Sequence, residues 1–159
     1  MIFKDLKIFS QNVQKNDLVV NTILKTQFHF NIIFIQEPPW STFGSISSSK
    51  CGEDEELVGM LNYLNWLTFV KSSTKNCDSL RVATFINIHL SSFQFSFHKD
   101  IFNHRDISLV SFFNNSVVFF LMNIYFDFSQ SALKHLKDTE ANIHNVLIMT
   151  GNFNIRDSL

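Results

Sequence analysis

The chain has 159 residues, of which 45% are hydrophobic and 17% are charged. This length and composition favour one packed globular domain over residues 1–159 and exclude an intrinsically disordered chain. The formal net charge of −1 gives no basic footprint of the kind that tight DNA binding needs. The N-terminus has no apolar leader, and the most apolar run, 117–125, is too short to span a bilayer. We therefore expect an intracellular protein, nuclear or cytoplasmic, without a membrane segment and without an evident protein partner.

The first part of the chain is predicted to form a strand, a helix and a second strand. Apolar segments at 6–12 and 31–36 have the length and composition of strands. Between them, residues 17–28 repeat their apolar side chains at helical spacing, and Asn16 or Asp17 can cap the start of this helix. A strand, a helix and a strand in this order make the two strands parallel, with their C-terminal ends at one edge of the sheet.

The middle of the chain carries an acidic run that could be mistaken for a metal site. Glu53 to Glu56 precede apolar residues at helical spacing, so they are better explained as the solvated first turn of a helix, where the helix dipole favours acidic side chains. Further strands are predicted at 64–70 and 80–90.

A hairpin and a second strand–helix–strand unit are predicted in the last third. The segments 106–113 and 117–125 are joined at Asn114-Asn115, and asparagine tolerates the backbone conformation of a tight turn. Ser129 can cap a following helix, and the chain then returns as a strand at 146–150.

The two units place polar residues at C-terminal strand ends on one edge, where open α/β sheets bind ligands. Mg²⁺ needs only one or two protein carboxylates when substrate phosphates complete its shell, so Glu37 with the side-chain oxygen of Asn12 is the candidate metal site. Tyr125 and Asn154 can donate hydrogen bonds to phosphoryl oxygens, and Asn152 is placed at a strand end on the same edge. Taken singly, Asn12 and Glu37 are better explained as a turn residue and an exposed side chain.

Four short motifs change that preference when they are taken together. In chain order they are Gln11-Asn12, Gln36-Glu37-Pro38, Asn123-Ile124-Tyr125 and Gly151-Asn152-Phe153-Asn154. With these motifs the chain resembles the endonuclease/exonuclease/phosphatase superfamily, and within it the endonuclease domain of LINE-type, non-LTR retrotransposons. The resemblance implies a two-sheet α/β sandwich, a divalent metal that is Mg²⁺ or Mn²⁺, a DNA partner, and phosphodiester cleavage with Asn12 and Glu37 at the metal and Tyr125, Asn152 and Asn154 as catalytic residues.

The chain departs from the family pattern in two places. The family's Gly-Asp-Phe-Asn motif carries Asn152 here, and an amide cannot take the proton of the attacking water; the loss of a general base costs about 10²–10⁴ in rate. The sequence also ends at Leu159, before the family's further aspartate and Ser-Asp-His motif. We therefore expect a sandwich that is incomplete at the C-terminus and a catalytically impaired or inactive endonuclease domain. The alternative is a non-catalytic module for nucleic-acid binding or interaction on the same scaffold.

Such an incomplete sandwich should leave the apolar faces of 117–125 and 146–149 uncovered, and the isolated chain should be poorly soluble. His98 and His104 are expected at the surface. Arg81 and Arg105 could contact phosphates, but arginine is common at protein surfaces, and both are left outside the predicted site.

Overall fold

Two helices and two four-stranded mixed sheets form the part of the chain that the structure describes. The structure is a computed structural model, and it describes residues 6–39, 65–70, 81–90, 93–98, 101–102, 104–114, 117–139 and 146–153. The acidic run and Asn154 lie outside these ranges. The elements are β1 (Ile8–Asn12), α1 (Asp17–Thr26), β2 (Ile32–Gln36), β3 (Trp66–Val70), β4 (Val82–Asn87), the 3₁₀ helix η3 (Ile88–Leu90), β5 (Gln94–Phe97), β6 (Ile107–Asn114), β7 (Val117–Phe126), α2 (Ser131–Asp138) and β8 (Val146–Phe153).

The first sheet has the strand order β1-β2-β4-β3. β1 and β2 are parallel, with Asn12 opposite Gln36, and α1 connects them, so the first predicted strand–helix–strand unit is confirmed. β4 lies antiparallel to β2 and places Val82 opposite Gln36. The residues that follow β2 and precede β4, Glu37 and Arg81, are therefore neighbours at this end of the sheet.

The second sheet has the order β5-β6-β7-β8. β6 and β7 form the predicted antiparallel hairpin, and β7 and β8 are parallel on either side of α2 in the chain, which confirms the second unit. Gly151 of β8 lies opposite Ile124. A Cβ atom at Gly151 would overlap the carbonyl oxygen of Ile124, so glycine at this position lets the two strands approach each other.

The starts of the two helices differ. Asn16 caps α1 as predicted, because its Oδ1 accepts a hydrogen bond of 3.2 Å from the backbone N–H of Val19. The prediction that Ser129 caps α2 is wrong. The hydroxyl and backbone N–H of Ser129 donate to Asp127 Oδ1 at 2.6 and 3.1 Å, and the cap position falls to Gln130, in the left-handed conformation with φ 52° and no side-chain cap bond. Because the Ser129 hydroxyl is hydrogen-bonded to Asp127, two residues upstream, it does not cap the helix.

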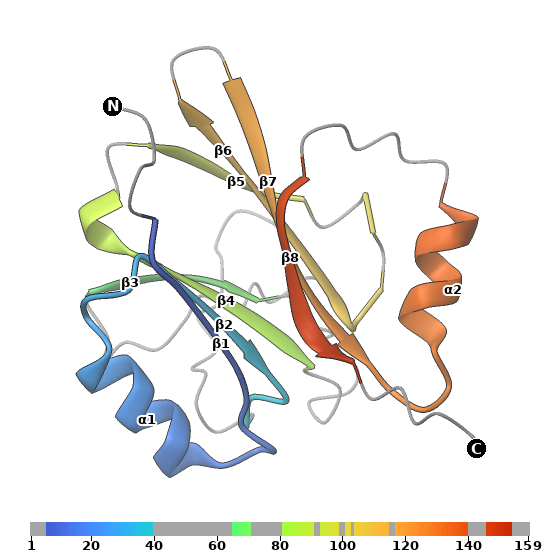
Figure 1. The fold of residues 1–159 in the computed structure, drawn as a ribbon, viewed down its shortest axis with the longest axis horizontal. Helices are drawn as coiled ribbons and strands as arrows, with labels where there is room; N and C mark the ends of the chain where they lie inside the picture. Colours follow the sequence, from blue (N-terminus) through green and yellow to red (C-terminus); the bar gives the residue numbers. More distant parts are fainter. Residues whose placement is uncertain are drawn as a thin grey trace, which may run out of the picture.

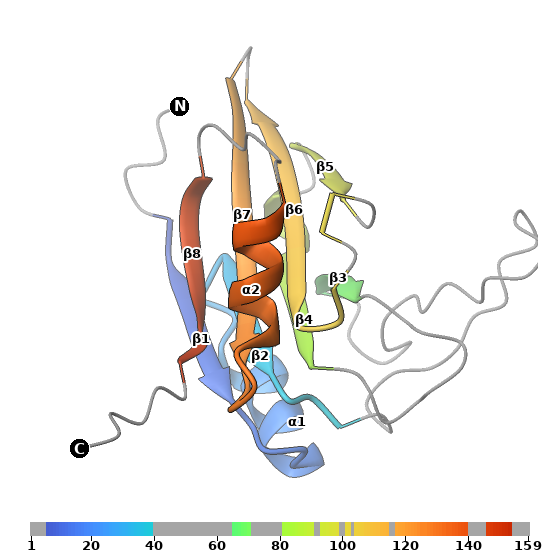
Figure 2. The ribbon, with the colours of Figure 1, turned by 90° about the vertical axis from the view of Figure 1, so that its right-hand side faces the viewer.

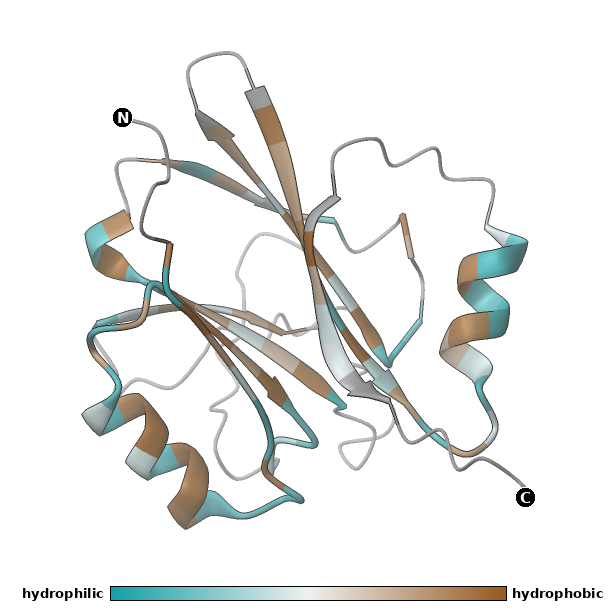
Figure 3. Cartoon of the chain, viewed as in Figure 1, coloured by the Kyte–Doolittle hydropathy of each residue, from teal (hydrophilic) through white to brown (hydrophobic). Residues whose placement is uncertain are grey.

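The layers follow the order α1, first sheet, second sheet, α2 (Figures 1 and 2). The face of the first sheet that does not meet the second packs against Val20, Ile23 and Leu24 of α1. The outer face of the second sheet packs against α2 through Ala132. Apolar residues line the strands of both sheets (Figure 3). Between the sheets lie Ile32, Phe34, Ile86, Val110, Phe112 and Leu121. This arrangement confirms the predicted two-sheet α/β sandwich.

The apolar strand β7 is covered, against expectation. Leu121 faces the first sheet, while Met122 and Ile124 pack on the side of α2, and all three are buried. The expectation of an uncovered face at 117–125 is wrong for these residues because the two packing layers lie within the described part. Met149 of β8 is 51% exposed, so the expected exposure is seen there.

β1 and β8 are edge strands of different sheets, and they lie side by side (Figure 2). The hydroxyl of Thr150 donates a hydrogen bond of 2.9 Å to that of Ser10 and joins the two edges. No helix among the described residues has the length and apolar character that crossing a bilayer requires.

Candidate active site

Glu37 stands at the centre of a polar cluster at the C-terminal end of β2. Its backbone has φ 49°, a conformation that is unfavourable for a residue with a side chain and that costs about 1–3 kcal/mol. Two backbone hydrogen bonds hold it: Glu37 N–H donates to the carbonyl of Arg81 at 2.7 Å, and its carbonyl accepts from Lys15 N–H at 2.8 Å. Strain of this kind persists where the surroundings fix it, and it is common at functional sites.

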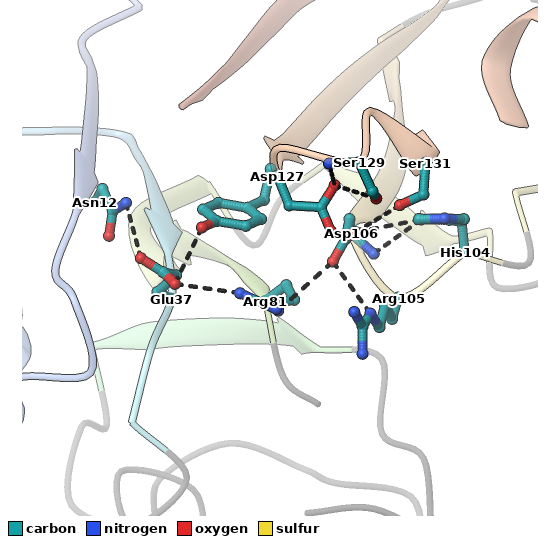
Figure 4. A network of polar contacts seen from close by, with 10 residues as sticks. Asn12, Glu37, Arg81, His104, Arg105, Asp106, Asp127, Ser129 and Ser131 are labelled. Atoms are coloured by element: carbon teal, nitrogen blue, oxygen red, sulfur yellow. Dashed lines mark hydrogen bonds and ion pairs between the residues drawn. The ribbon is translucent and has the colours of Figure 1, made fainter. Parts of the chain in front are cut away.

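The carboxylate of Glu37 accepts hydrogen bonds from three side chains, which belong to β1, to β7 and to the residue directly before β4. Asn12 Nδ2 donates to Oε2 at 3.0 Å. Tyr125 Oη and Arg81 Nη1 donate to Oε1 at 3.1 and 3.2 Å. The sequence-based inference that Asn12, Glu37 and Tyr125 meet at one edge is therefore confirmed by position, and Figure 4 shows the resulting network.

The amide of Asn12 is oriented by the turn that follows β1. Its Oδ1 accepts a hydrogen bond of 2.9 Å from the backbone N–H of Gln14. This leaves Nδ2 to face Glu37, so Asn12 acts on the carboxylate as a donor in this structure. Its predicted role as an oxygen ligand requires the other side of the amide.

Asn152 belongs to β8, where its backbone lies opposite Tyr125. The register therefore places Asn152 beside the strand that carries the Tyr125 phenol. Asn154 lies outside the described residues. The catalytic roles of Asn152, Asn154 and Tyr125 remain predictions.

Arg81 belongs to this cluster, although the sequence did not indicate it. Besides its ion pair with Glu37 Oε1 at 3.2 Å, its guanidinium lies 5.0 Å from the centroid of the Tyr125 ring, a cation–π contact. Its side chain is 23% exposed. Arg81 was left outside the predicted site, but the antiparallel pairing of β2 with β4 brings it to Glu37. A charged residue directly before a buried strand was the only signal in the sequence.

Asp106, which directly precedes β6, is the second residue that the sequence did not indicate. Its side chain is 0% exposed. Arg105 and Arg81 lie 3.6 and 3.9 Å from Oδ1, too far for good hydrogen bonds, and Oδ1 has no hydrogen-bond partner among the described residues. Ser131 Oγ donates to Oδ2 at 3.4 Å. Burial raises the pKa of Asp106, and the charges of Arg105 and Arg81 oppose the rise.

The two groups that flank Asp106 in the network have opposite pKa shifts. Burial raises the pKa of the Tyr125 phenol, and the charge and hydrogen bond of Glu37 add to this rise. Tyr125 is therefore neutral at pH 7 and can donate its proton in a hydrogen bond. The hydrogen bond from Ser129 lowers the pKa of Asp127, which is accordingly ionised.

A buried amide pair holds the strands that carry Glu37 and Tyr125. Asn123 Oδ1 accepts from Gln36 Nε2 at 2.7 Å, and Asn123 Nδ2 donates to the carbonyls of Ala83 and Ile35 at 2.9 and 3.2 Å. Gln36 and Asn123 are 1% and 0% exposed. These bonds join the two sheets one residue before Glu37 and two residues before Tyr125, and so fix the spacing of the site.

Two histidines expected at the surface are partly buried. His98 Nε2 lies 2.6 Å from Ser111 Oγ. The ring of His104 lies 5.1 Å from that of His135, and His104 Nδ1 is 3.8 Å from Asp106 Oδ2. The surface expectation is therefore wrong for both, because their neighbours come from strands and a helix distant in the sequence.

The groups around Glu37 do not fit a Mg²⁺ ion as they are arranged here. Three protein donors occupy the carboxylate, and one of them is a guanidinium. Among the described residues, no three His, Cys, Asp or Glu side chains are grouped so that they could hold a metal ion. An ion at Glu37 and Asn12 would have to displace Arg81 from Oε1 or the Asn12 amide nitrogen from Oε2.

Comparisons with known proteins bear on the fold. No family model matches the chain, and a search of curated proteins finds no match. Among solved structures, the chain is similar to the endonuclease domain of TRAS1, a telomere-specific non-LTR retrotransposon, with a TM-score of 0.64 and 17% sequence identity. The similarity covers 95% of this chain and 61% of that one, so the chain spans less than two thirds of the similar structure. The chain thus has the fold that its four motifs predicted, the α/β sandwich of a non-LTR retrotransposon endonuclease domain.

Proposed function

We propose that this chain is the endonuclease-like domain of a non-LTR retrotransposon, that DNA is its ligand, and that its hydrolysis of phosphodiesters is strongly impaired. The observation that carries the proposal is the convergence of Asn12, Glu37 and Tyr125 at the ends of β1, β2 and β7. The fold of the TRAS1 domain supports it. A domain with this role would act inside the cell, in the nucleus or the cytoplasm.

The retained residues can bind and orient a phosphodiester. Tyr125 is a neutral donor whose phenol could turn from Glu37 to a phosphoryl oxygen, and preorganised donors of this kind stabilise charge that develops there. Asn154, at the end of β8 in the sequence motif, could supply a second donor. Arg81, whose side chain is partly exposed and lies over the Tyr125 ring, adds a positive charge.

Two features support impairment. Asn152 cannot accept the proton of an attacking water, which lowers the rate by about 10²–10⁴ when no other base replaces it. Glu37, the predicted metal ligand, is already neutralised by Arg81 at 3.2 Å. The Mg²⁺ or Mn²⁺ that the family resemblance implies would therefore compete with a side chain of the protein itself.

The guanidinium of Arg81 also favours a second candidate function, DNA binding without cleavage. Arg81 and the half-exposed Arg105 lie on two sides of Asp106, and arginine forms directional contacts with phosphate. For binding of this kind, the logarithm of the binding constant falls linearly with the logarithm of the salt concentration.

The test is nicking of supercoiled plasmid in the presence of Mg²⁺ by the wild-type chain, Asn152→Asp and Glu37→Ala, with circular dichroism to confirm that each is folded. We expect nicking by wild type to be at the limit of detection, Asn152→Asp to raise it, and Glu37→Ala to abolish it. Robust wild-type nicking that Glu37→Ala abolishes would refute impairment. Salt-dependent DNA binding with no nicking by any folded variant would favour the second candidate.

A further inference from the structure

The carboxylate of Glu37 already has a cation, and that cation is part of the chain. Oε1 accepts from Arg81 Nη1 and from Tyr125 Oη, and Oε2 accepts from Asn12 Nδ2. One donor carries a full charge and two are neutral, so the negative charge of Glu37 is balanced without any other ion.

The guanidinium of Arg81 is held from three sides. Glu37 Oε1 lies 3.2 Å from Nη1 and Asp106 Oδ1 lies 3.9 Å from Nε, so a carboxylate stands at each end of the group (Figure 4). The ring of Tyr125 covers its face at 5.0 Å. The hydrogen bond to Glu37, the charge of Asp106 and the aromatic ring together restrict the position and orientation of the planar guanidinium.

A divalent cation at Glu37 would compete with groups that the carboxylate already binds. Mg²⁺ binds a carboxylate oxygen at about 2.0–2.1 Å and demands near-octahedral geometry. Its approach to Oε1 would bring two positive charges to one oxygen, and its approach to Oε2 would remove the hydrogen bond from Asn12. The backbone of Glu37 is held by its bonds to Arg81 and Lys15, so the carboxylate can leave these partners only by rotation of its side chain.

We propose that Arg81 takes the place of the divalent cation at Glu37, so that the site has a built-in, permanent cation and gains affinity for a divalent ion only when Arg81 is removed. The inference deepens the proposed function, and rests on it for the expectation that a metal belongs at Glu37. In this site the charge that meets a phosphate oxygen comes from the guanidinium.

The experiment measures Mn²⁺ binding to the full chain by the loss of the electron paramagnetic resonance signal of free Mn²⁺. Four proteins are compared: wild type, Arg81→Gln, Arg105→Gln, and the double variant Arg81→Gln/Glu37→Gln. Arg105→Gln is the matched control, because it removes the same charge from beside Asp106 and no bond to Glu37 is seen from that side chain. Circular dichroism confirms the fold of each.

We expect Arg81→Gln to bind Mn²⁺ at least 10-fold more tightly than wild type, Arg105→Gln to bind like wild type, and the double variant to lose the gain. An equal gain in Arg105→Gln, or no gain in folded Arg81→Gln, would overturn the proposal. A fifth protein, the single variant Glu37→Gln, supplies a second measurement should Arg81→Gln not fold. Mn²⁺ binding by wild type that Glu37→Gln abolishes overturns the proposal, and wild-type binding that is weak and unchanged in Glu37→Gln supports it. The absence of nicking by every variant would count against the proposed function. The Mn²⁺ titration does not depend on activity, so it tests the present proposal even in that case.

Discussion

The buried amide of Asn123 should be among the most costly polar groups to replace. Asn123→Leu keeps the side chain close to its original size but removes three hydrogen bonds, to Gln36, Ala83 and Ile35, at 2.7, 2.9 and 3.2 Å. At a net contribution of about 1 kcal/mol each, the bonds account for about 3 kcal/mol, and a buried donor left without its best acceptor costs about 1–3 kcal/mol more. The apolar surface of leucine offsets part of this, and we expect a net loss of about 2–4 kcal/mol.

Urea unfolding followed by circular dichroism and tryptophan fluorescence measures this loss, since Trp66 is buried in the first sheet. Gln36→Leu and the double variant Gln36→Leu/Asn123→Leu complete a double-mutant cycle. Because replacing both partners leaves no orphaned amide in the pair, the double variant should lose at least about 1 kcal/mol less than the sum of the two single variants. If the losses of the two single variants add up to that of the double variant within about 0.5 kcal/mol, the role assigned to this pair is refuted. A loss below about 0.5 kcal/mol for Asn123→Leu would refute it as well.

Four further outcomes are expected. Asn16→Ala removes the cap of α1 and should lower the free energy of unfolding by about 1 kcal/mol; an unchanged urea midpoint would contradict the cap. Gly151→Ala sets a methyl group against the carbonyl of Ile124 and should cost about 1–3 kcal/mol, whereas a wild-type midpoint would mean that β7 and β8 lie farther apart. The raised pKa of Tyr125 predicts that, of the two tyrosines, one ionises above the ordinary range in an ultraviolet absorbance titration, and Tyr125→Phe should remove that step and leave the other. Because the pKa of Asp106 is raised in the folded protein, its contribution to stability is complete below its ordinary pKa and is lost as the pH rises through the raised value. Asp106→Asn should therefore flatten the dependence of the unfolding free energy on pH in the acidic range. An identical dependence in the variant would show that Asp106 does not titrate in this range.

How much of the site was predictable depended on the distance in sequence over which the contacts form. Asn12 and Glu37 could be placed together because a strand, a helix and a strand of this length have one favoured arrangement. Tyr125 could be placed there because a second unit of the same kind ends at the same edge.

Arg81 and Asp106 could not be placed in this way. Their position depends on β4 pairing antiparallel with β2 and on the packing of the two sheets against each other, and neither is encoded by a local periodicity. A charged residue before a strand has the same appearance in sequence whether it faces water or a carboxylate from another element. Ser129 shows that short-range contacts can also be ambiguous. Its hydroxyl could bond either to Asp127 or to the start of the helix, and the sequence did not show which bond would form.

The bond between Gln36 and Asn123 joins residues 87 positions apart, and this separation governs the order in which the protein can mature during synthesis. The first sheet is complete in sequence at Asn87, yet the amide of Gln36 receives its buried partner only when Asn123 has left the ribosome. Until the strands of the second sheet follow, the inner face of that sheet, with Phe34 and Ile86, has no second layer. Contacts of such long range slow folding and prolong the exposure of apolar surface. We therefore expect the nascent N-terminal half to expose apolar surface until β7 packs onto the first sheet and Asn123 reaches Gln36.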